Sequence, residues 1–331
     1  MTSQAAQDYL FQQIRNSLPG DQNLVDIVSD ILHVSADSAY RRIRGETPLV
    51  LDEAQLLCKH FKLSLDQLLE VRPGATLFYT DRLHYAHFTF DAYLAGIRQQ
   101  LEQILSFSKK EIIYVSKDLP FFHNFSSEPL FAFHYFFWMK SILRHPDFAQ
   151  QKFSLDCLTP TIREEGKKIL NLYNQIPSTE IWNTECVNSI IFQVEYYREA
   201  GLFRKPADIH AVYGSVLDVM AHLKDQAEHG CKYLLGENYQ TKSENFRFFH
   251  NRITLGDNTI LAIADDRMTV FVNYDVINYM TTSDTVFCQE TYAELQALIK
   301  RCTQISTTSE KQRNIFFNML TGKVEDRKKT I

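Results

Sequence analysis

Residues 34–45, VSADSAYRRIRG, predict a short helix that carries three arginines and ends at a glycine. Ser35 suits the N-cap position, because its hydroxyl can accept a hydrogen bond from a backbone N–H of the first turn, and Gly45 suits the position after the last turn. Ala39 and Ile43 lie four residues apart and form a narrow apolar seam with Val34. The polar side chains of the helix therefore point away from the domain core.

These polar side chains are of the kinds that bind nucleic acid. They are Ser35, Ser38, Arg41, Arg42 and Arg44. Arginines bind phosphates and guanine edges, and a small hydroxyl near the start of a helix can reach a base edge or a phosphate in the major groove. A solvated face of charged residues would have the same composition, so the helix alone leaves both interpretations open.

Apolar residues recur at helical spacing on both sides of the arginine helix, and this pattern predicts an all-α domain over residues 1–72. Further short helices are expected over residues 8–18, 22–32, 51–61 and 64–69. Pro19-Gly20 and Pro48 interrupt the helical pattern, and the segment VRPG at 71–74 marks the end of the domain. Five short helices with the arginine helix in third place are the expected fold of this region.

This order of elements resembles the helix-turn-helix domains of the lambda repressor/Cro-like bacterial regulators, over roughly residues 8–71. The matching positions are Val28 and Leu32 as core residues, Ser29 at the helix crossing, Val34-Ser35 at the start of the recognition helix, Gly45 at its end, and the tail FKLSLDQLL at 61–69. Two positions depart from the family. His33 occupies the turn site that is usually glycine, and histidine tolerates positive φ. Val25 stands where many members carry a phosphate-contacting glutamine.

The resemblance implies DNA binding by residues 35–44 in the major groove, and the charge balance implies a dimer. Residues 1–72 hold seven Lys or Arg and ten Asp or Glu, a net charge of −3. Four of the acids lie near the groove-facing helices: Asp21, Asp26, Asp30 and Asp37. Because affinity for DNA depends on neutralising phosphates, we expect two subunits on a two-half-site operator to bind together.

Residues 73–331 predict a linker with an amphipathic helix over 73–109, followed by a mixed α/β domain over 110–331. The apolar stripe of residues 90–107 suits either a dimer seam or a helix packed on the next domain, and it is too short for a sustained heptad seam, which favours packing. Strands are expected at 111–116, 153–158, 179–182, 246–253, 259–264 and 268–274. Helices are expected at 130–143, 161–172, 183–200, 207–229, 285–302 and 310–320, and residues 325–331 are expected to fray. The whole chain is thus predicted to be α/β.

The order of strands and helices in this second domain loosely resembles the phospholipase D-like fold, which some transcriptional regulators use as a non-catalytic sensor. The catalytic pattern of that fold, HxK followed by an aspartate, is absent. The one HxK is His60-Phe61-Lys62, with Gln67 at the aspartate position. We therefore expect a sensor or oligomerisation domain and no enzyme activity.

Several smaller features have ordinary structural interpretations. His84 and His87 lack a third ligand at helical spacing, so no metal site is expected. His134 is predicted to be a buried, hydrogen-bonded histidine, and Asp265-Asp266 a plain turn. No glycine-rich phosphate loop occurs, so no nucleotide cofactor is expected.

Two further features leave an alternative open. Residues 281–284, TTSD, precede a predicted helix that could hold an anion, although Ser283 or Asp284 as an N-cap is favoured. The aromatic residues between 120 and 140 suit a small-molecule pocket or, preferably, a core. They are Phe121, Phe122, Phe125, Phe131, Phe133, Tyr135, Phe136, Phe137 and Trp138.

Composition and charge limit the function classes. The net charge is −5, so nucleic acid would have to bind a local patch. Six cysteines without a CxxC pair fit reduced thiols in a cytoplasm, and no signal peptide or membrane-spanning run is recognised. We expect a cytoplasmic, homodimeric DNA-binding regulator that acts on double-stranded DNA, with a small-molecule effector left open. The alternative is an enzyme or scaffold that uses the helix-turn-helix as a protein-binding adapter.

Overall fold

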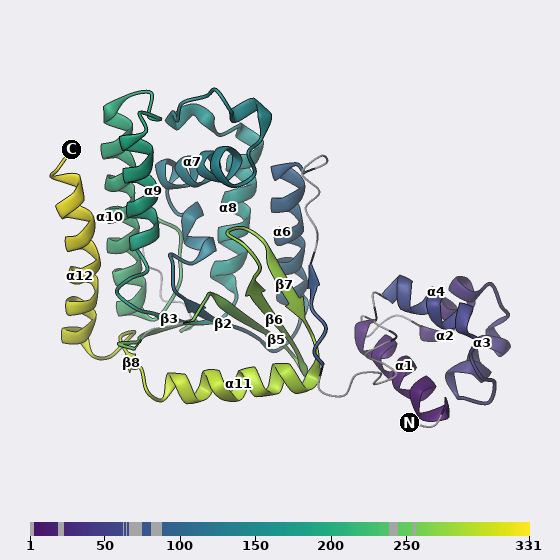
Figure 1. Ribbon diagram of the computed structural model, residues 1–331. Helices are drawn as coiled ribbons and strands as arrows, with labels where there is room; N and C mark the ends of the chain where they lie inside the picture. The colour runs from purple at the N-terminus through teal and green to yellow at the C-terminus, as the bar shows by residue number, and fades with distance from the viewer. Residues whose placement is uncertain are drawn as a thin grey trace. The chain divides into compact units, whose positions relative to one another are not determined.

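The computed structural model describes residues 3–18, 23–61, 63, 65, 75–80, 88–237, 244–253 and 256–331 (Figure 1). The chain divides into two units, Met1–Leu77 and Phe78–Ile331. Helix α6 (Phe90–Ser106), expected between two domains, belongs to the second unit. It packs on α8 (Pro160–Gln175), where Arg98 Nε lies 2.9 Å from Glu165 Oε2, so its apolar stripe covers this unit's own core.

The described part of the first unit is helical. Its elements are α1 (Ser3–Ser17), α2 (Leu24–Leu32), α3 (Ala36–Ile43) and α4 (Leu51–Phe61). Their apolar faces meet in one core that includes Ile14, Val28, Ala39 and Leu57, each fully buried. The helix expected at 64–69, apart from Leu65, lies outside the described residues, as do the break at Pro19-Gly20 and the boundary at 71–74. The α2, α3 and α4 boundaries agree with the sequence prediction to within two residues.

The described residues of the second unit form one eight-stranded mixed sheet. Its strands are β1 (Tyr79–Thr80), β2 (Lys110–Ser116), β3 (Ser178–Trp182), β4 (Phe246–His250), β5 (Thr259–Ala264), β6 (Arg267–Asn273), β7 (Tyr279–Thr282) and β8 (Thr303–Gln304). The spatial order is β1-β7-β6-β5-β2-β3-β4-β8, in which β2, β3 and β4 run parallel and every other pairing is antiparallel. The chain is therefore α/β, as predicted.

Helices cover both faces of this sheet (Figure 1). The larger layer holds α6, α8, α7 (Glu128–Phe137), α9 (Asn188–Glu199), α10 (Pro206–His229) and α12 (Glu310–Lys328). Helix α11 (Thr285–Ile299) covers the opposite face. Successive side chains of a strand point to opposite faces, so Ile112 and Tyr114 of β2 join the larger core while Ile113 and Val115 pack with α11.

Several expectations about secondary structure are wrong, among them the start of the helix predicted at 8–18, which begins at Ser3 as α1. The strand predicted at 153–158 is a single bridge between Phe153 and Phe203 followed by a 3-10 turn, because Phe153 is buried among aromatic rings and pairs with no strand. The helix predicted from residue 183 begins at Asn188. The chain end does not fray before Lys328, since Val324 of α12 is fully buried.

Two glycines inside helices give a matched stability prediction. Gly96→Ala in α6 is expected to raise the free energy of unfolding by roughly 0.5–1 kcal/mol, because alanine favours the helix and the added Cβ meets no atom within 4 Å. Gly166→Ala in α8 is expected to lower it by about 1–3 kcal/mol, because that Cβ would lie 2.6 Å from Phe131 Cε1. Urea titration of both variants measures the difference, and shifts of the same sign would contradict it.

Candidate nucleic-acid interface

A left-handed residue joins α2 to α3. His33 has φ 54° and ψ 42°, and its N–H donates to the Ser29 carbonyl. The Val34 N–H donates to the same carbonyl at 3.1 Å, while Ser29 Oγ donates back to the Val34 carbonyl at 2.6 Å. The prediction that His33 adopts positive φ is confirmed. This turn fixes the direction in which α3 leaves α2.

Ser35 and Gly45 define the ends of α3, as predicted. Ser35 Oγ accepts from the Ser38 backbone N–H at 3.3 Å and donates to Ser38 Oγ at 3.1 Å. Gly45 has φ 72°, a backbone conformation that residues other than glycine rarely adopt. Both serine hydroxyls thus take part in the cap at the start of the helix.

Arg41 and Arg44 project from α3 into solvent. Their side chains are 56% and 59% exposed, and their Nε atoms lie 3.9 Å and 3.4 Å from the carboxylate of Glu46. The Arg44 guanidinium also lies 5.6 Å from the ring centre of Tyr40, which is exposed. Exposed ion pairs of this kind are weak and are screened by salt, so both guanidinium groups can exchange a carboxylate for a phosphate.

Arg42 has a different environment from the other two arginines. Its Nη2 and Nε donate to the two oxygens of Glu53 at 2.8 Å and 3.1 Å, and its Nη1 donates to the Ser38 carbonyl at 3.2 Å. The two side chains are only 18% and 16% exposed. The hydrogen bonds from Arg42 lower the pKa of Glu53. Arg42 therefore ties α3 to α4, which is a structural role beside the predicted DNA contacts.

The side chain of Gln7 on α1 supports the loop that follows α3, and sequence reasoning missed it. Its amide donates to the carbonyls of Arg42 and Thr47 at 2.7 Å and 2.9 Å, and its Oε1 accepts from the Leu49 N–H at 2.9 Å. The partners lie at least 35 residues away in the chain, so no local pattern indicates them. Tyr40 was also missed, although the helical spacing indicates an exposed aromatic beside the arginines.

Three other candidate residues, His134, Asp265 and Asp284, have the structural roles that were favoured. Buried His134 bonds the Leu130 carbonyl through Nδ1 at 3.2 Å. Asp284 caps α11, because its Oδ1 accepts from the Phe287 N–H at 2.9 Å. Asp265 forms the β5–β6 turn with φ 53°. His84 and His87 lie outside the described residues, and no three His, Cys, Asp or Glu among those described are placed to hold a metal ion.

The aromatic segment between 120 and 140 divides between core and cavity. Most of its rings are buried in the core of the second unit, with Phe133 and Phe136 fully covered. Phe121 and Phe122 also line a cleft beneath α6. The core interpretation therefore holds for most of the segment, and the pocket interpretation applies to its first two rings.

A buried carboxylate in β3 has no counterpart in the sequence prediction. Glu180 is fully buried and accepts hydrogen bonds from His123 Nε2 at 3.0 Å, Tyr173 Oη at 2.5 Å and Trp182 Nε1 at 2.9 Å. Burial raises the pKa of Glu180, but His123, Tyr173 and the nearby Lys232 outweigh this effect and lower it. The ammonium of Lys232 donates to the Tyr173 carbonyl at 2.7 Å. Glu180 thus organises polar groups from four separate segments.

Protonation of His134 gives a prediction for the stability of the second unit. Burial lowers the pKa of His134 from 6.5 to about 4, so the unfolded chain takes up a proton before the folded chain does. Stability is therefore lost as pH falls from 6.5 towards 4, by up to about 3 kcal/mol for this group. His134→Gln should flatten that pH dependence in urea titrations, whereas His210→Gln at an exposed site should not. An unchanged slope in the first variant would refute the assignment.

Comparison of the chain with models of protein families, with curated proteins and with solved structures finds no match. No helix among the described residues has both the length and the apolar character needed to cross a membrane. The function must therefore be inferred from the geometry described above.

Proposed function

We propose that this protein is a sequence-specific DNA-binding regulator that places α3 in the major groove. The observation that supports this best is the left-handed turn at His33 between α2 and α3, with Arg41 and Arg44 on the exposed face of α3. Two helices joined in this way form the helix-turn-helix motif, in which the second helix reads the groove.

The polar residues on and beside α3 have distinct roles in this proposal. Residues near the start of a recognition helix contact base edges, so Ser35, Asp37 and Ser38 are the candidates for direct readout. Arg41 and Arg44 follow one turn later and bind phosphates or guanine edges. Arg42 holds α3 against α4 through Glu53 and so sets the angle at which the recognition helix meets DNA.

We further propose that the protein acts as a homodimer in the cytoplasm. A net charge of −3 over residues 1–72 limits the affinity of one subunit, and two subunits on paired half-sites double the number of phosphate contacts. The cytoplasmic assignment is supported by six cysteines that are all free thiols, which a reducing compartment preserves.

Selection of genomic fragments by the full-length protein, followed by affinity measurements over a range of salt concentrations, tests the proposal. We expect enrichment of a sequence with two half-sites and a linear fall of log affinity with log salt, because phosphate binding releases counterions. Random recovery of fragments together with a flat salt dependence would refute DNA binding.

The second candidate function is a protein-binding adapter. It is favoured by Val50 and Leu51 at the start of α4, which are 60% and 73% exposed and would suit an apolar partner surface. An adapter predicts that Leu51→Ser abolishes partner binding while no DNA sequence is enriched. The same fragment selection therefore separates the two functions.

A further inference from the structure

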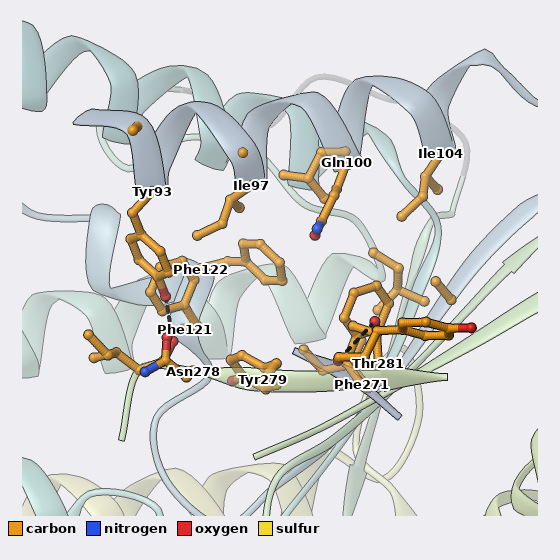
Figure 2. Close-up of a pocket in the computed structure, with 18 of the residues that line it drawn as sticks. Tyr93, Ile97, Gln100, Ile104, Phe121, Phe122, Phe271, Asn278, Tyr279 and Thr281 are labelled. Atoms are coloured by element: carbon orange, nitrogen blue, oxygen red, sulfur yellow. Dashed lines mark hydrogen bonds between the residues drawn. The ribbon is translucent and has the colours of Figure 1, made fainter. Parts of the chain in front are cut away.

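A cleft of about 490 Å³ lies between α6 and the sheet in the second unit (Figure 2). Strands β5, β6 and β7 supply one wall, and α6 and the 3-10 turn at Phe121–Phe125 supply the others. Clefts of about 300–1,000 Å³ with apolar walls and a few polar groups are typical of small-molecule sites. The site lies wholly within the second unit and does not depend on DNA binding.

The walls of the cleft are apolar and held in place by hydrogen bonds. Tyr93 Oη donates to the Ile277 carbonyl at 2.7 Å, and Tyr279 Oη lies 3.3 Å from Tyr114 Oη, so both rings are fixed without a ligand. Figure 2 shows Ile97 and Ile104 of α6 pointing down towards Phe271 on the strands. A ligand would therefore enter a cleft whose shape is already formed, which reduces the entropic cost of binding.

A glycine in α6 keeps the cleft open. Gly96 lies within the helix, where glycine is unfavourable by about 1 kcal/mol relative to alanine. A Cβ at this position would meet no atom within 4 Å, so close packing does not require glycine here. Gly96 lines the cleft at an exposed position of α6, so a longer side chain here would add bulk beside the cleft. The unfavourable residue is therefore placed where it adds space for a ligand.

Beside the cleft lies a smaller cavity of about 240 Å³ whose lining includes Arg267, with the guanidinium 5.3 Å from the ring centre of Phe107. The two spaces share lining residues, among them Gln100, Phe271 and Thr281. Figure 2 shows the amide of Gln100 pointing between the helix and the strands. Among the described residues that line either space, Arg267 is the single charged one. The described lining of the cleft is thus uncharged, and the smaller cavity beside it contributes one cation.

We propose that this cleft binds a free long-chain fatty acid, with its hydrocarbon chain beneath α6 and its carboxylate at Arg267. Uncharged walls disfavour any ligand that is charged along its length, because a buried charge without a partner is strongly penalised. The guanidinium of arginine matches the geometry of a carboxylate and forms charge-assisted hydrogen bonds with it. The side-chain amide of Gln100, which lines both spaces, provides a further polar atom between the cleft and Arg267.

Tryptophan fluorescence of the full-length protein reports on binding. The ring of Phe121, which lines the cleft, stacks on Trp138 with 5.6 Å between ring centres. Octanoate, dodecanoate and hexadecanoate are titrated below their critical micelle concentrations, with dodecanol as the uncharged counterpart of dodecanoate. We expect a saturable change in fluorescence with dodecanoate that Trp138→Phe removes, since the second tryptophan, Trp182, packs on His123 and Phe248 and not on the cleft residue Phe121.

Two substitutions separate the roles of the chain and the headgroup. Gly96→Leu adds a bulky apolar side chain to the lining of the cleft and should weaken dodecanoate binding about tenfold. Arg267→Gln should weaken dodecanoate binding roughly tenfold and leave dodecanol unaffected, as expected for removal of a charge-assisted hydrogen bond. Arg301→Gln, at an exposed arginine outside the cleft, is the control. Circular dichroism confirms that each variant is folded.

Three outcomes would overturn this proposal. The first is the absence of saturable binding at any chain length. The second is wild-type affinity in folded Gly96→Leu, which would place the ligand elsewhere. The third is an equal loss of dodecanoate and dodecanol binding in Arg267→Gln, which would mean that Arg267 does not recognise the carboxylate.

Discussion

Replacing Arg41 and Arg44 together by alanine should weaken DNA binding by about 2–4 kcal/mol, on the order of 100-fold in Kd. Both guanidinium groups lie on the exposed face of α3, and their pairs with Glu46 are long and solvent-screened. Removal of each phosphate-binding arginine should also reduce the slope of log affinity against log salt by about one. Fluorescence anisotropy with the selected fragment, at several salt concentrations, measures both quantities.

Two further variants serve as controls for the loss of DNA affinity in the double variant. Arg301→Ala, in the second unit, should bind DNA like the wild type. Arg42→Ala removes the partner of Glu53 and should lower the melting temperature of the first unit, so its binding defect should follow its loss of structure. The double variant should melt like the wild type. Wild-type affinity and an unchanged slope of log affinity against log salt in the double variant would contradict the proposed roles of Arg41 and Arg44.

Replacing Glu180 by alanine should lower the free energy of unfolding of the second unit by about 3–5 kcal/mol. The carboxylate is fully buried and accepts hydrogen bonds from three side chains, and its removal leaves those donors without an acceptor. Because the folded pKa of Glu180 lies below its ordinary value of 4.5, this stabilisation is present above pH 4.5 and is lost as pH falls through the folded pKa.

Urea unfolding monitored by circular dichroism tests the role of Glu180. Glu180→Gln keeps the shape of the side chain and should cost less than Glu180→Ala, although it cannot accept all of the same hydrogen bonds. Glu102→Ala removes a carboxylate that pairs with Arg98 at an exposed site and should cost under about 1 kcal/mol. Equal effects of Glu180→Ala and Glu102→Ala would contradict the importance of the buried network.

Local signals predicted most of the first unit correctly. The cap at Ser35, the glycine after α3 and the positive φ at His33 each depend on neighbours within five residues, so they can be recognised in the sequence. The same holds for α8, which begins at Pro160 after the Thr159 cap. The prediction of a strand at 153–158 was wrong because a short apolar segment has the same residue pattern whether it joins a sheet or packs irregularly in the core.

The sequence by itself determined the arginine helix, its caps and the α/β class, because these follow from side-chain types at fixed short spacings. Tertiary structure decided which arginine is available, since Glu53 engages Arg42 from another helix. It also assembled the Glu180 network and the cleft beneath α6, whose residues lie up to about 200 positions apart. Burial and pairing over such separations depend on how the elements pack, and no periodicity within one element encodes them.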